Sequence, residues 1–436
     1  MAVSYKEDVR WKRPTSSRSA WSSLVGICLG LLAFEMLRHL VVSYLLASPT
    51  LAAPSKLSRP LTFKRDGTFQ LSIFEDLHFG ENAWEDWGPQ QDIKSIQVLE
   101  DVLDYDTPDL VVLNGDLITG ENTYVENSTD YVDMIVKPLL DRGLRWASTY
   151  GNHDYQVNLT GKNILERERK WPNALTRQMV FDRNAGVSNY YLPVFPSNCA
   201  DSAKCAPELL LWFFDSRGGS YYQQWDENGS EIGQPNWVDR SVVDWLRKTN
   251  DKLVAKHKKV IPSLAFVHIP TYASLVLQTQ SGVDGKRQPG INDDYPLSPQ
   301  AQGWCADGRN DGSCSYGGQD TAFMRAITKT AGLMALFSGH DHGDTWCYKW
   351  DGVVPGLAVE GNGINVCFGQ HSGYGGYGSW IRGARQVLIS KSKLKNLAVD
   401  TWIRLESGNK VGSVSLNSTY NLDEYPKTPN DKTSLD

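Results

Sequence analysis

The 436-residue sequence lacks the excess of basic residues that nucleic-acid-binding proteins carry. It has 44 Lys and Arg against 50 Asp and Glu, which gives a formal charge of −6. The first 53 residues hold six of the basic and three of the acidic residues, so the remainder has 38 against 47, or −9. A surface this acidic repels a phosphate backbone. The charge balance therefore excludes nucleic acid from the expected partners.

The sequence also lacks the Cys-x-x-Cys spacing that is typical of structural zinc sites. Cys28 lies in an apolar N-terminal stretch, and the other six cysteines fall into close pairs: Cys199 with Cys205, Cys305 with Cys314, and Cys347 with Cys367. An even number of cysteines at short separations predicts disulfide bonds, which persist outside the cytosol. Four sequons for N-glycosylation agree with export, at Asn127, Asn158, Asn228 and Asn417.

The N-terminal region has no single apolar run of the roughly 20 residues that a membrane-spanning helix needs. Residues 21–34 and 40–47 are apolar, but Glu35, Arg38 and His39 separate them. If translation starts at Met36, the second run forms the core of a signal peptide cleaved after Ala53, which predicts a secreted protein. If the whole N-terminus is present, its basic end favours a single-pass type II membrane anchor instead. The sequence leaves both alternatives open.

Apolar periodicity predicts strands and helices in alternation after residue 69. Strands are predicted at 69–74, 110–114, 146–150, 208–214, 264–267 and 333–338, and helices at 93–103, 131–140, 238–256 and 321–330. Short β segments follow residue 345, and residues 271–318 form a long polar insertion. This alternation favours an α/β fold. The expected organisation is an N-terminal signal or anchor region (1–53), a linker (54–68), one domain (69–415) and a polar tail without ordered structure (416–436).

Acidic, Asn and His residues recur just past the predicted strands. They are Asp76, His78, Asp116, Asn152, His153, His268, His340 and His342. Loops at the carboxyl ends of strands form the ligand crevice of α/β proteins. Imidazole, carboxylate and amide groups suit two divalent ions such as Zn, Fe or Mn, with one carboxylate bridging them. The pattern therefore predicts a binuclear metal centre.

These residues resemble the five sequence blocks of the calcineurin-like metallophosphoesterases, in the same order. The blocks are Asp76-Leu-His78, Gly115-Asp116, Gly151-Asn152-His153-Asp154, His268 and Gly339-His340-Asp341-His342. The surrounding sequence is most similar to the branch called Dcr2-like or purple-acid-phosphatase-29-like. The resemblance implies an α/β/β/α sandwich with two central mixed β-sheets.

The resemblance also implies a role for each residue. One metal would bind Asp76, His78 and His342, and the other Asn152, His268 and His340, with Asp116 bridging both. A water activated by the metals would attack phosphorus, His153 would stabilise or protonate the leaving oxygen as general acid, and Asp154 could orient His153. The implied activity is hydrolysis of phosphate monoesters, either small esters or phosphoproteins. A phosphodiesterase and a non-catalytic glycan-binding protein on the same scaffold are the alternatives.

The sequence departs from the purple acid phosphatase pattern at Thr119. Those enzymes carry a tyrosine three residues after the bridging Asp, and their first block has Gly where this chain has His78. We therefore expect no ferric-tyrosinate chromophore. Outside the blocks, Arg217 is interpreted as a surface turn residue in preference to a phosphate contact, and His371 as a loop residue. Five aromatic residues could either line the cleft or pack loops: Trp84, Trp87, Tyr221, Tyr222 and Trp225.

Overall fold

The computed structural model describes residues 59–297, 302–303, 305–306 and 313–434. These residues belong to one compact unit. The predicted signal or anchor region, with Cys28 and Met36, lies outside the described residues. Within the described ranges, no helix is both long and apolar enough to cross a membrane.

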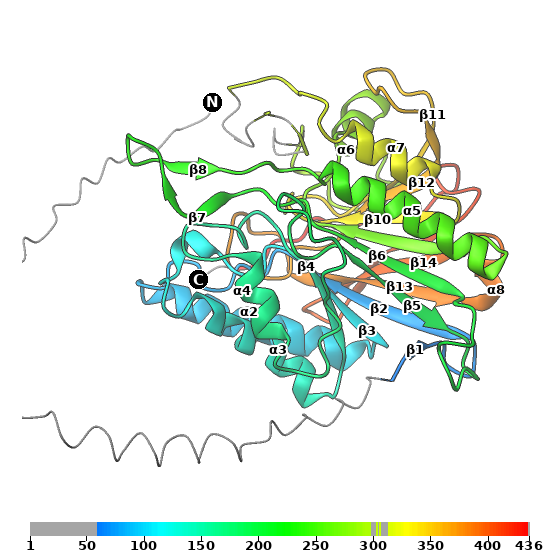
Figure 1. Ribbon diagram of the computed structural model, residues 1–436, viewed down its shortest axis with the longest axis horizontal. Coiled ribbons are helices and arrows are strands. Elements are labelled where there is room, and N and C mark those ends of the chain that lie inside the picture. The colour runs from blue at the N-terminus through cyan, green and yellow to red at the C-terminus, as the bar shows by residue number, and fades with distance from the viewer. Residues whose placement is uncertain (1–58, 298–301, 304, 307–312, 435–436) are drawn as a thin grey trace, which may run out of the picture. The chain divides into compact units, whose positions relative to one another are not determined.

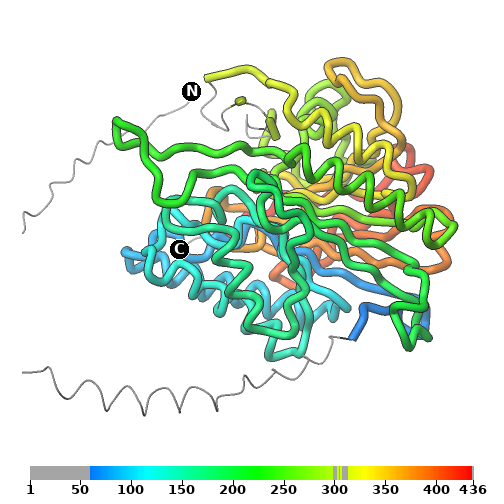
Figure 2. The backbone as a smooth tube through the Cα atoms, in the orientation of Figure 1, coloured from blue at the N-terminus to red at the C-terminus, as the bar shows by residue number. Residues whose placement is uncertain are grey.

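Two mixed β-sheets form the centre of the fold (Figure 1). The seven-stranded sheet has the order β1 (Leu61–Thr62), β5 (Tyr190–Phe195), β6 (Leu209–Phe214), β9 (Ser263–Val267), β10 (Leu333–Ser338), β12 (Gly361–Phe368) and β11 (Cys347–Gly352). The six-stranded sheet has the order β15 (Lys410–Leu416), β14 (Val399–Leu405), β13 (Gly383–Ser390), β2 (Thr68–Phe74), β3 (Leu110–Asn114) and β4 (Trp146–Thr149). Figure 2 shows how the late strands, in orange, return to lie beside the early blue strand β2.

Helices cover the outer face of each sheet (Figure 1). The six-stranded sheet carries α2 (Trp87–Tyr105) and α3 (Tyr131–Asp141), with α4 (Gly161–Glu168) beside α3. The seven-stranded sheet carries α5 (Arg240–His257) and α7 (Thr321–Lys329), next to α6 (Tyr272–Val276) and the π-helix η3 (Leu277–Ser281). Smaller elements are η1 (Gly120–Asn122), η2 (Ser128–Asp130), α8 (Lys391–Leu394) and the hairpin of β7 (Ser220–Trp225) and β8 (Glu231–Gly233).

Three apolar clusters fill the three interfaces between these layers. One joins α5 and α7 to the seven-stranded sheet, with Val243 and Ile327 among its members. A second lies between the two sheets and includes Leu71 and Phe266. The third lies beneath α2 and α3, where Leu99 and Val136 are buried. The expected α/β/β/α sandwich with two mixed sheets is confirmed.

The strands and helices predicted from periodicity are present, and the missed elements have weak sequence signals. β5 contains Pro193, which has no N–H for the sheet and is unusual within a strand. α4 spans eight residues and starts at Thr160, whose hydroxyl accepts the Asn163 backbone N–H. β1 falls within the stretch predicted as a linker. The domain boundaries themselves stay predictions.

The expectation that the C-terminal tail lacks ordered structure was wrong. Tyr420 is buried, and its hydroxyl donates to the carbonyl of Cys347. Lys432 lies 2.9 Å from a carboxylate oxygen of Asp293 and its ammonium group lies over the ring of Trp380. These contacts order the tail although most of its residues are polar. The buried tyrosine ring and the lysine ion pair hold the two ends of the polar segment that lies between them.

All three predicted disulfides are present: Cys199–Cys205, Cys305–Cys314 and Cys347–Cys367. Cys347 and Cys367 lie opposite each other on the antiparallel strands β11 and β12 and belong to the cluster between the sheets. This disulfide therefore fixes the edge of the seven-stranded sheet.

Replacing both Cys347 and Cys367 by Ala should lower the free energy of unfolding by about 3 kcal/mol, because the bond closes a loop 20 residues apart in sequence. Urea denaturation followed by tryptophan fluorescence measures this change. Cys199 and Cys205 are only six residues apart, so the same double substitution there is the matched control and should cost less. Equal effects of the two double substitutions would contradict the expectation.

Candidate metal centre

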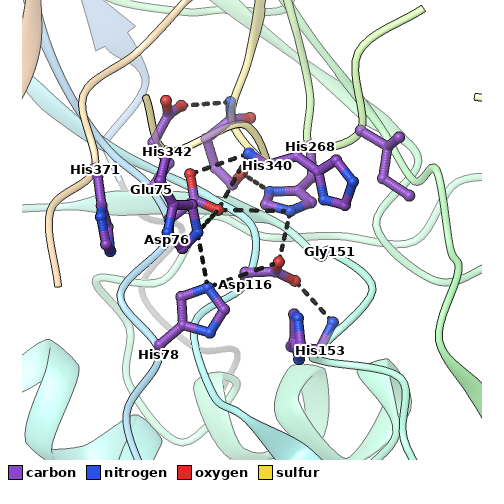
Figure 3. Close-up of polar contacts among 12 residues, drawn as sticks. Glu75, Asp76, His78, Asp116, Gly151, His153, His268, His340, His342 and His371 are labelled. Carbon is purple, nitrogen blue, oxygen red and sulfur yellow. Dashed lines mark hydrogen bonds and ion pairs between the residues drawn. The ribbon is translucent and has the colours of Figure 1, made fainter. Parts of the chain in front are cut away.

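The predicted ligands lie at the carboxyl ends of parallel strands from both sheets. Asp76 and His78 follow β2, Asp116 follows β3, Asn152 follows β4, His268 follows β9, and His340 and His342 follow β10. Backbone hydrogen bonds connect these loops: the N–H of Asp76 donates to Gly115, that of His78 to Asp116, and that of Gly339 to His268. The structure therefore brings six of the predicted ligands to one place (Figure 3): Asp76, His78, Asp116, His268, His340 and His342. Asn152 lies between Gly151 and His153, and both of these residues lie against Asp116.

Two groups of side chains could each hold a metal ion. Asp76, His78 and His342 form one group, and Asp116, His268 and His340 form the other, with the ligand atoms of each group within 4.8 Å of one another. An oxygen of Asp116 lies 2.8 Å from Nε2 of His268 and 4.0 Å from Nε2 of His78. Asp116 therefore lies between the two groups, the position that a bridging carboxylate requires.

Hydrogen bonds to Nδ1 fix the orientation of three of the histidines. Nδ1 of His268 donates to the carbonyl of Asn114 at 2.9 Å, and Nδ1 of His342 donates to that of Tyr377 at 2.8 Å. Nδ1 of His78 lies 3.0 Å from the hydroxyl of Thr119, which in turn donates to Glu81 at 2.7 Å. When Nδ1 carries the proton in these bonds, Nε2 of each ring is the atom left to bind a metal.

Several observations show that the residues fit a metal. Nε2 of His340 and Oδ1 of Asn152 are buried and have no hydrogen-bond partner among the described residues. Nε2 of His78 and Nε2 of His342 face each other at 3.2 Å. Burial lowers the pKa of His340 to about 3, so this ring is neutral at pH 7. Unpaired buried ligand atoms and facing imidazole nitrogens are unfavourable unless a cation lies between them.

Backbone strain is concentrated at the same positions. Asp76, His78, Asp116 and His340 have φ of 53°, 48°, 47° and 77°, in the left-handed region that side chains other than glycine seldom adopt. Such strain persists only where the surrounding structure holds it, and it is common at functional sites. The short turns after the strands therefore hold these carboxylates and imidazole rings at the candidate metal centre, in a backbone conformation that the residues would not adopt by their own preference.

Replacing Gly151 by Ala should lower metal content and activity about 10- to 100-fold, as expected when the support of a metal site is displaced. A Cβ atom on Gly151 would lie 2.5 Å from the ring of His268 and 2.6 Å from the backbone nitrogen of Asp116, closer than atoms pack. Elemental analysis of the purified variant measures the loss. Gly285 is the control, because its Cβ would meet only Lys427, at 3.8 Å. Full metal content in Gly151→Ala would contradict this geometry.

His153 lies beside the two groups and is held by Glu121. Its Nδ1 lies 2.6 Å from an oxygen of Glu121, and its backbone N–H donates to Asp116 at 2.8 Å. Burial opposes the charge of the ring, but Glu121 and Asp116 outweigh it and raise the pKa of His153 to about 10. A histidine that keeps its proton at neutral pH is suited to donate it.

The suggestion that Asp154 orients His153 was wrong. The carboxylate of Asp154 accepts the backbone N–H groups of Leu117, Ile118 and Gly151, so it holds the two loops together. Glu121, in the short helix η1, takes the orienting position instead. No pattern in the sequence indicated this role, because a lone Glu in a polar stretch has no distinctive spacing.

His371 and Tyr377 are further residues of the centre that the sequence did not identify as such. His371 is buried, and its ring lies 3.8 Å from that of His342, measured between centroids. The ring of Tyr377 stacks on His342 at 4.1 Å. His342 is therefore held between two aromatic rings by the glycine-rich loop that follows β12.

Comparisons with known proteins agree with this geometry. The family model described as calcineurin-like phosphoesterase matches residues 76–344, more than half of the chain. An Arabidopsis thaliana protein named probable inactive purple acid phosphatase 14 is 26% identical, over 80% of this chain and 84% of its own. Phosphatase DCR2 of Saccharomyces cerevisiae is 26% identical, over 79% of this chain and 55% of its own.

Among solved structures, a dimetal phosphatase from Danio rerio is similar with a TM-score of 0.48 and 13% identity, covering 80% of this chain and 98% of that one. The family match includes every predicted ligand, from Asp76 to His342. The chain is thus a member of the calcineurin-like phosphoesterase family.

Proposed function

We propose that this protein is a metal-dependent phosphatase that hydrolyses phosphate monoesters. The observation that carries the proposal is the pair of adjacent buried ligand groups, in which Asp116 lies 2.8 Å from His268 of its own group and 4.0 Å from His78 of the other. Asp76, His78 and His342 would hold one cation and Asn152, His268 and His340 the other, with Asp116 between them. Two divalent cations of the Zn, Fe or Mn type would neutralise phosphate oxygens and lower the pKa of the attacking water.

His153 would supply the proton that the leaving oxygen needs. Its ring is positioned by Glu121, and 30% of the side chain is exposed, so part of the side chain can be reached by a substrate. The backbone bond from His153 to Asp116 ties this proton donor to the bridging carboxylate. The same hydrogen bond fixes the backbone of His153 relative to Asp116, so the proton donor would keep a constant position beside the ligands.

Two observations support an active enzyme over a binding protein on the same scaffold. The positions of all seven proposed ligands carry groups able to bind a metal. Glu121, Thr119 and Tyr377 also orient the histidines, which a glycan-binding surface does not require. The glycan-binding alternative can be tested at five exposed aromatic residues: Trp84, Trp87, Tyr221, Tyr222 and Trp225.

We also infer that the protein enters the secretory pathway. Three disulfides support this route, because such bonds are rare in the cytosol. Asn127 and Asn228 are exposed and free to carry glycans, whereas the amide of Asn158 donates to the carbonyl of Thr123 at 2.9 Å. Whether the N-terminal region is cleaved or anchors the protein is decided by sequencing the mature N-terminus.

Hydrolysis of p-nitrophenyl phosphate and bis-p-nitrophenyl phosphate tests the proposed function. We expect the metal-loaded protein to prefer the monoester, and a chelator to abolish the rate. Preference for the diester would favour the phosphodiesterase alternative. A rate unchanged by complete metal removal would exclude both, and glycan binding without hydrolysis would favour the binding protein.

A further inference from the structure

A cavity of about 590 Å³ lies beside the candidate metal centre. Its wall includes Arg217 and Ser220, and the intervening Gly218 packs against the side chain of Asn152. None of the proposed metal ligands lines the cavity, and neither does His153. A volume of this size accommodates a small organic ligand. The cavity is therefore distinct from the candidate metal centre and adjoins it at Asn152.

The wall contains a buried positive charge without an ion-pair partner. Arg217 is only 4% exposed, although the sequence favoured a surface turn residue. Its Nη2 donates to the carbonyl of Trp237 at 2.6 Å, and its guanidinium lies over the Trp237 ring. Within the described ranges, its Nε has no hydrogen-bond partner and no carboxylate lies within ion-pair distance. A buried unpaired charge is costly, so this arrangement favours an anionic ligand.

The nearest acidic residue in the sequence is engaged elsewhere. One oxygen of Asp215 accepts bonds from the Tyr155 hydroxyl and from the backbone and hydroxyl of Ser188. The other oxygen accepts the backbone N–H of Arg217. Arg217 also has φ of 57°, so the loop holds this residue in a strained conformation. Asp215 thus shapes the loop without forming an ion pair with the guanidinium. Burial lowers the pKa of Arg217, and the nearby charges of Asp215 and Asp239 only partly offset this effect.

The mouth of the cavity presents flat apolar surfaces and further positive charge. Phe181 is 79% exposed, and Tyr221 and Tyr222 are 37% and 41% exposed. Lys162 and Arg183 also line the cavity, against a single acidic residue, Asp182. Exposed aromatic rings around a cationic pocket suit an anion that carries a planar or apolar group.

We propose that this cavity is a subsite for a second anionic group, carried on the leaving alcohol of the phosphate ester. The anion pairs with Arg217, and the organic part of the leaving group lies against Phe181 and Tyr222. The position of the subsite in catalysis rests on the proposed function, whereas the binding of an organic anion does not. The subsite would make the enzyme selective for esters with two anionic groups over simple ones.

Benzoate binding to the metal-free protein tests the cavity without catalysis. Isothermal titration calorimetry should detect benzoate but not the neutral analogue benzyl alcohol. Arg217→Gln should weaken benzoate binding about 10- to 100-fold, the usual cost of losing a charged hydrogen-bond partner. Arg325→Gln, an exposed position on α7, is the matched control and should leave binding unchanged. Equal binding of benzoate and benzyl alcohol would overturn the proposal, as would undiminished binding to Arg217→Gln.

Two further variants guard against misfolding. Arg217→Lys keeps the charge and should retain more benzoate binding than Arg217→Gln. Phe181→Ala changes an exposed side chain, so the fold is not at risk, and it should weaken benzoate binding about 2- to 10-fold. Thermal unfolding of each variant checks the fold. If Phe181→Ala binds benzoate as the unaltered protein does, the assigned surface is wrong.

Kinetics place the subsite in the reaction. With the metal-loaded protein, kcat/KM should be higher for phosphate esters whose alcohol carries a carboxylate or second phosphate than for phenyl phosphate. Arg217→Gln should remove this preference and leave phenyl phosphate hydrolysis unchanged. An equal loss for both kinds of ester would show that Arg217 contacts the reacting phosphate, which overturns the subsite. If no ester is hydrolysed, the proposed function fails, and the benzoate titration still tests the cavity.

Discussion

Replacing Asp116 by Asn should remove bound metal and lower kcat/KM by about 100-fold or more, while the protein stays folded. Loss of a residue that only hydrogen-bonds to a metal ligand already lowers metal affinity or activity about 10- to 100-fold. Asp116 itself lies between both ligand groups, so its loss should have a larger effect. Asn keeps an oxygen that can accept the backbone N–H of His153, so the loop geometry is preserved. Elemental analysis and steady-state kinetics on the same preparation measure both effects.

The control for this substitution is Asp141→Asn, which removes an exposed carboxylate at the end of α3 that pairs only with Lys137 within the described ranges. It should change neither metal content nor rate, because exposed ion pairs contribute little. If Asp116→Asn retained two metals and full activity, Asp116 would not be the shared ligand and the proposed centre would be wrong.

Replacing His153 by Gln should lower kcat about 100- to 1,000-fold for an alkyl phosphate without lowering metal content. The effect should be much smaller for p-nitrophenyl phosphate, because p-nitrophenolate departs without needing a proton. A general acid is required only where the leaving oxygen is strongly basic. The comparison of the two substrates therefore separates proton donation from a structural effect.

Glu121→Gln is the matched test of orientation, since it keeps a hydrogen-bond acceptor for Nδ1 of His153 but removes the charge. It should lower kcat for the alkyl phosphate less than His153→Gln does. Equal losses on both substrates in the His153 variant would argue against a proton donor. They would favour a direct contact of His153 with the phosphate.

The sequence predicted a ligand set because each proposed ligand follows an apolar strand. Parallel strands end at the same edge of a sheet, so residues just past several such strands meet even when they lie far apart in the chain. The pattern of strands and helices was equally readable, since burial on one or both faces imposes the period of the apolar residues. β5 and α4 were missed because one contains a proline and the other is short.

The partners of the ligands could not be predicted in the same way. Glu121 lies in the short helix η1, and His371 and Tyr377 lie in the loop after β12. No repeating pattern marks these residues, and their contacts depend on how these segments fold over the strand ends. Asp154 follows His153 directly, yet its carboxylate binds backbone N–H groups of another loop. Sequence proximity was therefore a poor guide to side-chain contact.

The sequence by itself predicted the fold class, disulfide bonds among cysteines that fall into close pairs, and the residue types of the candidate metal centre. Each of these follows from short-range spacing: apolar period, cysteine separation, and ligands placed just after strands. Only the tertiary structure decided that Glu121 orients His153, that two rings hold His342, and that Arg217 is buried with no carboxylate of the described residues at ion-pair distance. The reason is physical, because these properties depend on packing and burial, which are set by residues distant in the chain.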